Sequence, residues 1–470
     1  MFVHQKNENL GSQYPSVPLI PLIVALLIGV LVNAKFGLVA IMTVIVLLVT
    51  VLLVTSRSLF ARCVFWLLVS KPIVDLTWRW NVGSVAGQRL NLQTLIGLYA
   101  IFLVIVVWIL RRPVVSAWPV VGLVGASALS VLLSIGTAGF SNGLNDFLRL
   151  TSGISLFFVA GSVLCKEHIF RRFAWLVVVT ITVPLALSLL QLWGRLPYES
   201  WDWISGMQVG RLSGSYPHVA NLVCYLTYGH LLALYLFSRS NKAVQRVFLL
   251  MWMGLLYYVL YYTYHRTAYL VIALQLVSWL YLQRQGVLAL LTGVAGAIGA
   301  ITRLSVVKEL YASSLVALSS PAAVFTQSFL RGRGEQWSRY LRDFAHFRPF
   351  YWLTGRGNAL LIGDYPQYVL ASDDPHNDFL RFLYTYGFLG LFFYLGTLFS
   401  LFGVALRLLK LSTRRFDKDL GRLVLLSVVS IAVMSMTTVP TRYPAAVWYL
   451  FVLGSVATSR YRQNRQANWR

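Results

Sequence analysis

Long apolar segments recur from one end of the chain to the other, and short polar loops separate them. Each segment has about 17 to 25 residues, which is the length that an α-helix needs to cross a bilayer core. The segments lack the apolar–polar alternation that the strands of a membrane barrel show. Since backbone polar groups must be satisfied within hydrocarbon, we expect helices. The pattern predicts an all-α, polytopic integral membrane protein with about 14 transmembrane helices, in a range of about 12 to 14.

The spacing of these segments divides the chain into three predicted parts. Residues 1–301 hold about eleven helices, of which the first two are expected at about 18–32 and 37–54. Residues 302–378 form a long polar segment, and residues 379–470 hold the last helices and a basic tail. We therefore expect an N-terminal helical bundle, one long loop that is partly helical, and a C-terminal group of helices.

Basic residues occupy every second short loop between the predicted helices. Because Lys and Arg are retained in cytoplasmic loops, this alternation assigns the topology. Both termini are then cytoplasmic, and the 302–378 loop lies on the outer side of the membrane. The basic loops contain Arg57, Arg62, Arg111, Arg112, Lys166, Arg171, Arg172, Arg239, Lys242, Arg246, Arg284, Arg407, Lys410, Arg414, Arg415 and Lys418.

The composition agrees with a membrane protein. Of the 470 residues, 58% are hydrophobic and 12% are charged, whereas soluble domains have about 25% charged residues. A formal net charge of +25 would suggest nucleic-acid binding in a soluble protein. Here the basic cytoplasmic loops account for the charge, so no nucleic-acid partner is expected. The three cysteines, Cys63, Cys165 and Cys224, have neither metal-site nor disulfide spacing.

Arginine is unusually common on the predicted outer side. Arg211, Arg266 and Arg442 lie there at helix ends. The guanidinium group forms a planar fork that suits phosphate, and charged groups at a membrane edge are candidates for function. We therefore predict a binding site for an anionic lipid headgroup. The alternative is structural pairing with the acidic residues Asp75, Asp146 and Asp202.

The long loop contains a predicted amphipathic helix and a glycine turn. In "QSFLRGRGEQWSRYLRDFAHF" one helical face carries Phe329, Trp337, Leu341, Phe344 and Phe347. We expect this helix to lie on the membrane surface. The glycines of the Gly-Arg-Gly turn at 355–357 allow a tight turn or a close approach of two backbone segments.

A polar run at 373–378 leads directly into the next predicted helix. Asp and Asn at a helix start satisfy free amide groups, so capping accounts for one or two of these residues. His376 is a poor cap, and it lies at the membrane surface near many arginines. Nearby cations favour the neutral imidazole, which a general base requires. His376 is thus a candidate for proton transfer.

Four stretches together resemble the O-antigen ligase and polysaccharide polymerase superfamily of the bacterial inner membrane. "DDPHNDFLRFLYTYGFLGLFFYL" is similar to the His-Asn signature that opens a late helix. "RGRGEQWSRYLRDFAHFRPFYWLTGRG" resembles the periplasmic stretch in which an Arg, a Trp four residues on, and a Gly-x-Gly follow one another. "GRLSGSYPHVANLVCYL" and "YHRTAYLVIAL" resemble two outer segments with an arginine before or at a helix start. The resemblance extends from about 140 to 455 and is strongest between 331 and 391.

The resemblance implies a periplasmic glycosyltransferase with an oligosaccharide on undecaprenyl pyrophosphate as its donor. The acceptor would be a sugar hydroxyl on a glycan or on a lipid-linked glycan. By resemblance, His376 is the base that activates this hydroxyl, and Arg211 and Arg266 hold the pyrophosphate. Arg333 is a candidate for positioning the donor or the loop, and Asn377 belongs to the same signature. Membrane lipids, a flippase and a chain-length regulator are the further partners that such a protein implies.

Neither a metal nor a cofactor is expected, because fixed arginines can meet the charge of the leaving group. Asp373 and Asp374 leave a metal-dependent variant open. Asp417 and Asp419 resemble a metal-binding Asp-x-Asp pair, but they lie on the predicted cytoplasmic side.

Three alternatives remain open at this point. Where the family often has Asn-Pro, the chain has Pro217, His218 and Val219, so His218 is a second outer histidine that could bind substrate or act as the base. A ligase would transfer the glycan to lipid A core, whereas a polymerase would transfer it to the next repeat unit. The stretch "KPIVDLTWRWNVGSVAGQRLNLQTL" resembles exopolysaccharide polymerases more than ligases, and this resemblance favours the polymerase. A transporter or flippase is the alternative of another class, although the inverted repeats typical of transporters are not evident.

Overall fold

The structure is a computed structural model, and it describes residues 57–85, 88–111, 117–135, 140–204, 207–293, 333–357 and 375–468. The chain divides into two compact units, Met1–Phe60 and Ala61–Arg470. Of the first unit, only the last four residues are described. The second unit holds every candidate site residue named above.

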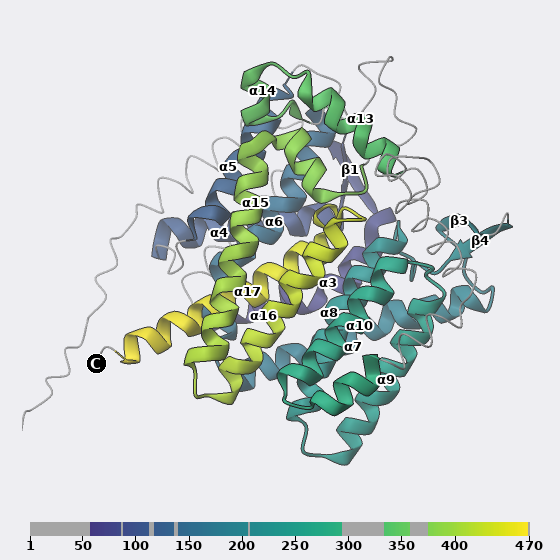
Figure 1. Cartoon of the computed structure of the whole chain (residues 1–470), viewed down its shortest axis with the longest axis vertical. Coiled ribbons are helices and arrows are strands. Elements are labelled where there is room, and N and C mark those ends of the chain that lie inside the picture. The colour runs from purple at the N-terminus through teal and green to yellow at the C-terminus, as the bar shows by residue number, and fades with distance from the viewer. Residues whose placement is uncertain are drawn as a thin grey trace, which may run out of the picture. The chain divides into compact units, whose positions relative to one another are not determined.

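Long helices make up most of the described part of the chain (Figure 1). In chain order they are α3 (Arg57–Val74), α4 (Leu92–Arg111), α5 (Trp118–Leu133), α6 (Phe140–Leu164), α7 (Glu167–Leu192), α8 (Val219–Arg239), α9 (Ala243–Tyr261), α10 (Arg266–Leu282), α15 (Asp378–Leu411), α16 (Arg415–Ser435) and α17 (Pro444–Asn468). Two shorter helices are α13 (Arg333–Ala345) and α14 (Pro349–Thr354), and two 3-10 turns are η2 (Asp75–Arg79) and η7 (Pro440–Arg442). The prediction of an all-α protein is confirmed for this part of the chain.

Two β-hairpins were not predicted. The first pairs β1 (Asn81–Val85) with β2 (Gln88–Asn91), and the second pairs β3 (Ser200–Ile204) with β4 (Met207–Arg211), both antiparallel. Strands of four or five residues within loops leave too short a pattern to recognise by alternation. The second hairpin matters for the site because β4 ends at Arg211.

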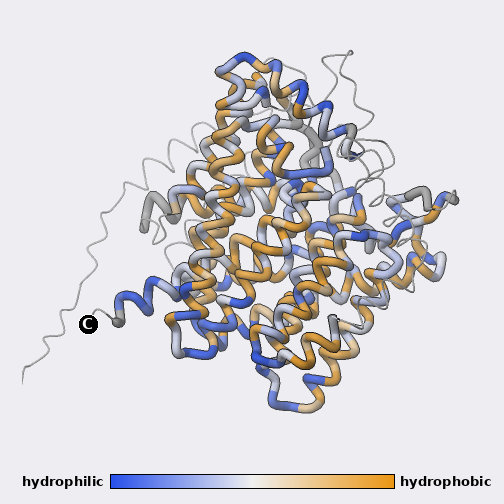
Figure 2. Tube along the Cα trace, in the orientation of Figure 1, coloured by the Kyte–Doolittle hydropathy of each residue, from blue (hydrophilic) through white to orange (hydrophobic). Residues whose placement is uncertain are grey.

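Five described helical segments are long and apolar enough to cross a membrane: Gly143–Leu164, Glu167–Leu192, Val219–Arg239, Ala243–Tyr261 and Asp378–Leu411. Three shorter apolar helices are Leu92–Ile105, Trp118–Leu133 and Arg266–Leu282. Figure 2 shows apolar residues along the helices and hydrophilic residues gathered at their ends. These features support the membrane class. The total of about 14 spans exceeds the five segments and stays a prediction, and the helices expected at 18–32 and 37–54 lie outside the described residues.

Helix α8 lies at the centre of the described bundle. In its most apolar window 94% of the residues are buried, whereas the corresponding figure for α9 is 33%. Helix α9 exposes a row of apolar side chains, namely Val244, Val247, Leu250 and Met251. A helix that is apolar all round belongs in the interior, and an exposed apolar face suits contact with lipid. The central position of α8 also fixes its first residues in space.

Small residues allow α6 and α17 to pack closely. A side chain at Gly153 would overlap Val447, and a side chain at Gly161 would overlap Ser455 and Ser459. The backbone amide of Gly161 donates to Ser455 Oγ at 2.7 Å. Close approach of backbones at small residues is a common way for helices to associate in membranes.

Helix α15 is kinked at Gly387, which has a φ of 65°. A Cβ atom on Gly387 would overlap the backbone of Leu353 and Gly355, and one on Gly355 would overlap Thr385. The Arg356 amide donates to the Tyr384 carbonyl at 3.3 Å. The predicted close approach at the Gly-Arg-Gly turn is therefore confirmed, and its partner is the kink of α15.

Replacing Gly387 with alanine is expected to lower the thermal stability of the purified protein. The left-handed φ alone costs a non-glycine residue about 1 to 3 kcal/mol, and the added methyl group overlaps backbone that cannot rotate away. Gly403→Ala is the matched control, because Gly403 lies in the same helix with open space around it. We expect a clear drop in melting temperature for Gly387→Ala and none for Gly403→Ala. Equal melting temperatures would contradict the packing described at the kink.

The predicted amphipathic helix is present as α13. Its residues Tyr340 and Phe344 pack with Phe347 against Tyr384 of α15, and all four side chains are buried. Of the apolar positions used for the prediction, Leu341 is 44% exposed. Part of the apolar side of α13 thus covers protein. The expected position of this helix on the membrane surface stays a prediction, and Phe329 lies outside the described residues. The tight contact with α15 holds the start of α13 near the start of α15.

Helices α8, α10 and α15 end at the same end of the bundle, and ion pairs connect the helices there. Asp419 Oδ2 accepts from Arg239 Nε at 2.6 Å, and Asp419 Oδ1 accepts from Arg422 at 2.5 Å. Asp417 Oδ1 accepts from Arg460 Nε at 2.8 Å. Both carboxylates of the Asp-x-Asp pair therefore serve to tie helices together. The connected residues lie on α8, α16 and α17.

Candidate functional site

Several helices begin at the other end of the bundle, which we call the N-cap end. Helices α8, α10, α13 and α15 all start there. The N-cap residues of α8, α10 and α15 are His218, His265 and Asn377, and the first residue of α13 is Arg333. A helix N-terminus carries a partial positive charge and free amide groups. The N-cap end therefore suits anions even before its side chains are considered.

The connection between α16 and α17, residues 436–443, ties these helix starts together. We call it the α16–α17 turn. Asn377 Nδ2 donates to the Met436 carbonyl at 3.2 Å, and Arg333 donates to the Thr437 carbonyl at 2.8 Å. The Thr437 hydroxyl is 2.6 Å from the hydroxyl of Thr267, in the first turn of α10. Three segments that are far apart in sequence thus meet at two consecutive residues.

Asn377 and His376 open α15. Asn377 is the N-cap residue, and its Oδ1 accepts from the Leu380 amide at 3.0 Å. His376 is half-buried and has a φ of 48°, in the left-handed region. The Trp337 indole of α13 donates to the Pro375 carbonyl at 2.8 Å, directly before His376. A non-glycine residue held in this conformation costs about 1 to 3 kcal/mol, and such residues concentrate at functional sites.

Two further left-handed residues precede other candidate site residues. Ser215 has a φ of 66° and lies just before His218, and Tyr264 has a φ of 51° and lies just before His265. Among the described residues, Arg284 is the remaining non-glycine example. Three of the four therefore lie in the loops that lead to helix starts at the N-cap end.

His218 caps α8 through its side chain. Its Nδ1 accepts from the Ala220 amide at 3.1 Å, and the ring stacks on Tyr443 of the α16–α17 turn at a centroid distance of 5.7 Å. A backbone amide can only donate, so Nδ1 must be the acceptor and the proton of the neutral ring lies on Nε2. A neutral His218 consequently has no free nitrogen that could take a proton. This argues against His218 as the base and for a structural or substrate-binding role.

Arg211 and Arg266 flank one sharp turn. Arg211 Nε donates to the Thr263 carbonyl at 2.8 Å, and the Leu212 amide donates to the Tyr262 carbonyl at 3.3 Å. These bonds attach the end of β4 to the turn between α9 and α10. Arg266 is the first residue of α10 and is half-buried. The two arginines predicted to hold an anion are therefore brought to the same turn.

His265 was not predicted as a site residue, although it lies in this turn. The side chain is 8% exposed, and its Nδ1 has no hydrogen-bond partner. Burial lowers the pKa of His265 to about 3, helped by the nearby charges of Arg211, His218 and Arg333. The same electrostatic contacts indicate that these residues of four separate segments lie close together. The signal available in the sequence was its position directly before Arg266 at a helix start.

Other arginines of the predicted outer side have structural partners. Arg381 donates to Asp146 Oδ2 at 2.7 Å and lies 3.6 Å from Asp378 Oδ1, with all three side chains buried. Arg442 Nε lies 3.6 Å from Asp146 Oδ2. Arg356 lies over the Phe347 ring at 4.3 Å. The structural-pairing alternative is thus correct for Asp146, whereas Asp75 pairs with Lys71 and the side chain of Asp202 lies outside the described residues.

Asp146→Ala is expected to destabilise the protein strongly. It would leave the buried Arg381 without its closest carboxylate, and breaking a buried pair in this way costs about 3 to 5 kcal/mol. Glu199→Gln is the control, since it removes an ion pair with the exposed Arg79, where about 0 to 1 kcal/mol is expected. Thermal unfolding in detergent measures both. A loss for Asp146→Ala no larger than that for Glu199→Gln would show that the buried network contributes little.

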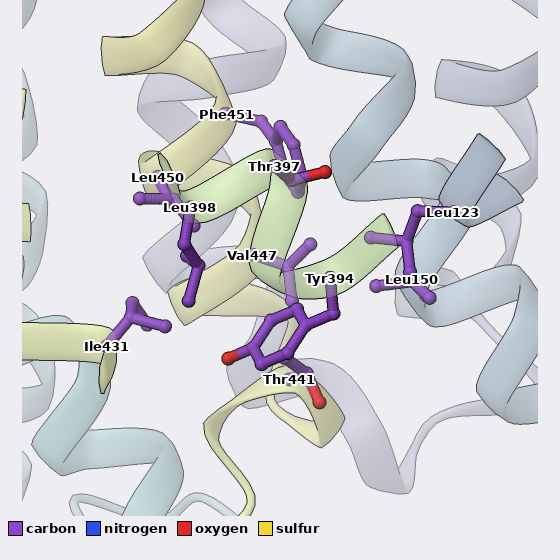
Figure 3. A pocket seen from close by; sticks show the side chains of 10 residues that line it. All are labelled: Leu123, Leu150, Tyr394, Thr397, Leu398, Ile431, Thr441, Val447, Leu450 and Phe451. Carbon is purple, nitrogen blue, oxygen red and sulfur yellow. The ribbon is translucent and has the colours of Figure 1, made fainter. Parts of the chain in front are cut away.

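A small pocket lies among α5, α6, α15, α16 and α17 (Figure 3). It is lined by Leu123, Leu150, Tyr394, Thr397, Leu398, Ile431, Thr441, Val447, Leu450 and Phe451. None of these lining side chains is charged, so the pocket lacks the groups that bind a phosphate. This pocket is therefore not a candidate for the predicted anion site.

The chain matches no protein-family model and no curated protein. Its function is accordingly inferred from the residues at the N-cap end and from their geometry.

Proposed function

We propose that the protein is an inverting glycosyltransferase of the bacterial inner membrane. It would move an oligosaccharide from undecaprenyl pyrophosphate to an acceptor sugar hydroxyl at the periplasmic face, polymerising the repeat units of a cell-surface polysaccharide. One observation carries the proposal. The predicted site residues come from four distant segments, and they are Arg211, Arg266, Arg333 and the His376–Asn377 pair. All of them lie where helix N-termini meet the α16–α17 turn or the turn at His265. The family resemblance of the sequence motifs points to the same residues.

The proposed reaction assigns a distinct task to each group. His376 takes the proton of the acceptor hydroxyl as its oxygen attacks the anomeric carbon. The bond from that carbon to the pyrophosphate breaks on the opposite face, so the configuration inverts and undecaprenyl pyrophosphate leaves. Arg211 and Arg266 face the growing charge on the phosphate oxygens, which preorganised donors stabilise. Arg333 and Asn377 hold the start of α13 and α15 against the α16–α17 turn, and His218 fixes the start of α8.

The proposal includes the membrane arrangement expected from the charge pattern. About 14 helices would cross the inner membrane, with both termini cytoplasmic and the N-cap end periplasmic. The exposed apolar side chains of α9 would contact membrane lipids. The donor, a glycan or lipid-linked acceptor, a flippase and a chain-length regulator would be the working partners. Since fixed arginines can meet the charge of the leaving group, the proposal invokes no metal and no cofactor.

The products of purified protein in proteoliposomes distinguish polymerase, ligase and transporter. With lipid-linked repeat units as the substrate, a polymerase produces a ladder of lengthening glycans. A ligase instead transfers one glycan to lipid A core when that acceptor is supplied. A transporter moves the glycan across the bilayer without changing its length. We expect the ladder; movement without any new glycosidic bond would rule out the proposed function.

A further inference from the structure

His265 is an exception to the rule that buried polar atoms have partners. Native structures satisfy about nine in ten buried polar groups, and each exception calls for a specific reason. The side chain is more than nine-tenths buried, and its Nδ1 lacks a hydrogen-bond partner. The backbone around it is fully engaged: the His265 amide donates to Thr263 Oγ1 at 3.3 Å, and its carbonyl accepts from the Ala268 amide at 2.9 Å.

The ordinary roles of a histidine at this position do not apply. It is the N-cap residue of α10, yet its side chain makes no capping bond. Among the described residues, no group of three His, Cys, Asp or Glu side chains is placed to hold a metal ion. With a pKa of about 3, the ring is also too weak a base to take a proton efficiently near neutral pH. A hydrogen bond to a bound molecule is a use that fits these observations.

The surroundings of His265 specify an anion. Arg211 at the end of β4 and Arg333 at the start of α13 both exert their charge on it. Arg266 follows it directly, and the N-terminus of α10 begins there. Burial, together with the charges of Arg211 and Arg333, keeps the imidazole neutral. A neutral imidazole with its proton on Nδ1 can donate one hydrogen bond, and cations around it would attract an acceptor with negative charge.

We propose that His265 Nδ1 donates a hydrogen bond to a phosphate oxygen of the pyrophosphate group on the lipid donor. The inference rests on the proposed function, and it adds a neutral donor between the arginines. A neutral donor orients the phosphate without adding charge that must be desolvated. Thr263 connects His265 to Arg211: its carbonyl accepts from Arg211 Nε, and its hydroxyl oxygen accepts from the His265 amide. These two bonds hold the imidazole and the guanidinium group on the same turn.

Two polar substitutions test which nitrogen makes the contact. The amide nitrogen of asparagine falls close to the position of Nδ1, whereas that of glutamine falls close to Nε2. His265→Asn should therefore keep the contact, and His265→Gln and His265→Phe should lose it. The probe is inorganic pyrophosphate, titrated by calorimetry into the purified full-length chain in detergent. His346→Asn is the control, because His346 is exposed at the same end and bonds through Nδ1 to the Arg342 carbonyl.

We expect His265→Asn and His346→Asn to bind pyrophosphate within about threefold of the wild type. The glutamine and phenylalanine variants should bind at least about tenfold more weakly. Melting temperatures show whether each variant is folded. If the phenylalanine variant does not fold, the comparison of His265→Asn with His265→Gln is enough to test the proposal. Equal binding by Asn and Gln variants would overturn the proposal, as would a wild type that binds phosphatidylglycerol vesicles but no pyrophosphate. If the wild type failed to bind pyrophosphate but still transferred glycan, the role of His265 would be wrong and the proposed function would be retained. A failure of the His265 proposal can therefore be distinguished from a failure of the proposed function.

Discussion

His376→Ala is expected to lower glycan transfer by about 10²- to 10⁴-fold, the usual contribution of a positioned general base. The backbone at His376 is held in a left-handed conformation between two fixed points, the Pro375 carbonyl bonded to Trp337 and the Asn377 side chain bonded to Met436. A backbone held in this way limits the positions that the side chain can take before the substrate arrives. Transfer is measured in proteoliposomes with lipid-linked repeat units, and melting temperature reports whether the variant is folded.

Two other histidines provide controls for this result. His218→Asn retains a good N-cap for α8, and the ring it replaces already uses Nδ1 as an acceptor. We expect it to keep more than about a tenth of the activity, because no proton transfer is lost. His346→Ala, at an exposed position, should match the wild type. Activity lost in His218→Asn but retained in His376→Ala would assign the base to His218.

Arg211→Lys is expected to slow transfer by about 10²- to 10³-fold, the cost of removing one preorganised donor from a developing charge. Arg211 Nε is bonded to the Thr263 carbonyl at 2.8 Å, which fixes the plane of the guanidinium group. Lysine keeps the positive charge but is a point donor on a flexible stem, so it cannot both hold the turn and present a planar fork. The loss should appear in kcat more than in KM, because the charge develops in the transition state.

Arg348→Lys is the matched control for this substitution. Arg348 lies at the same end of the bundle but is exposed, at the N-cap position of α14. We expect activity within about twofold of the wild type, as for most surface changes away from a site. If Arg211→Lys behaved like Arg348→Lys, the guanidinium geometry would have no part in the reaction, and a simple attraction of charge would suffice.

The sequence predicts the helices well because their signal is local. The length of each apolar segment predicts a helix, and the direction that the basic loops assign to it stays a prediction. The close approach at Gly355 also follows from local chemistry, since only glycine tolerates it. The expectation that capping accounts for one or two residues of the 373–378 run is also local, and in the structure Asn377 is the N-cap residue of α15.

The parts that could not be predicted depend on tertiary neighbours. Thr437 carries no chemical signature, yet its carbonyl and hydroxyl connect α10 and α13. The partner of each arginine on the predicted outer side depends on whether the fold places a carboxylate next to it. Arg381 forms an ion pair with Asp146, whereas Arg211 donates to a backbone carbonyl. The unpartnered nitrogen of His265 is likewise a property of its surroundings in the fold.

The central claim is that a bond from a sugar to pyrophosphate breaks at the N-cap end. The most direct measurement is the release of undecaprenyl pyrophosphate from lipid-linked oligosaccharide by purified protein in proteoliposomes, counted against new glycosidic bonds. We expect one undecaprenyl pyrophosphate for each new bond, with both products lost together in His376→Ala. Glycan that crosses the bilayer while its pyrophosphate link stays intact would contradict the claim.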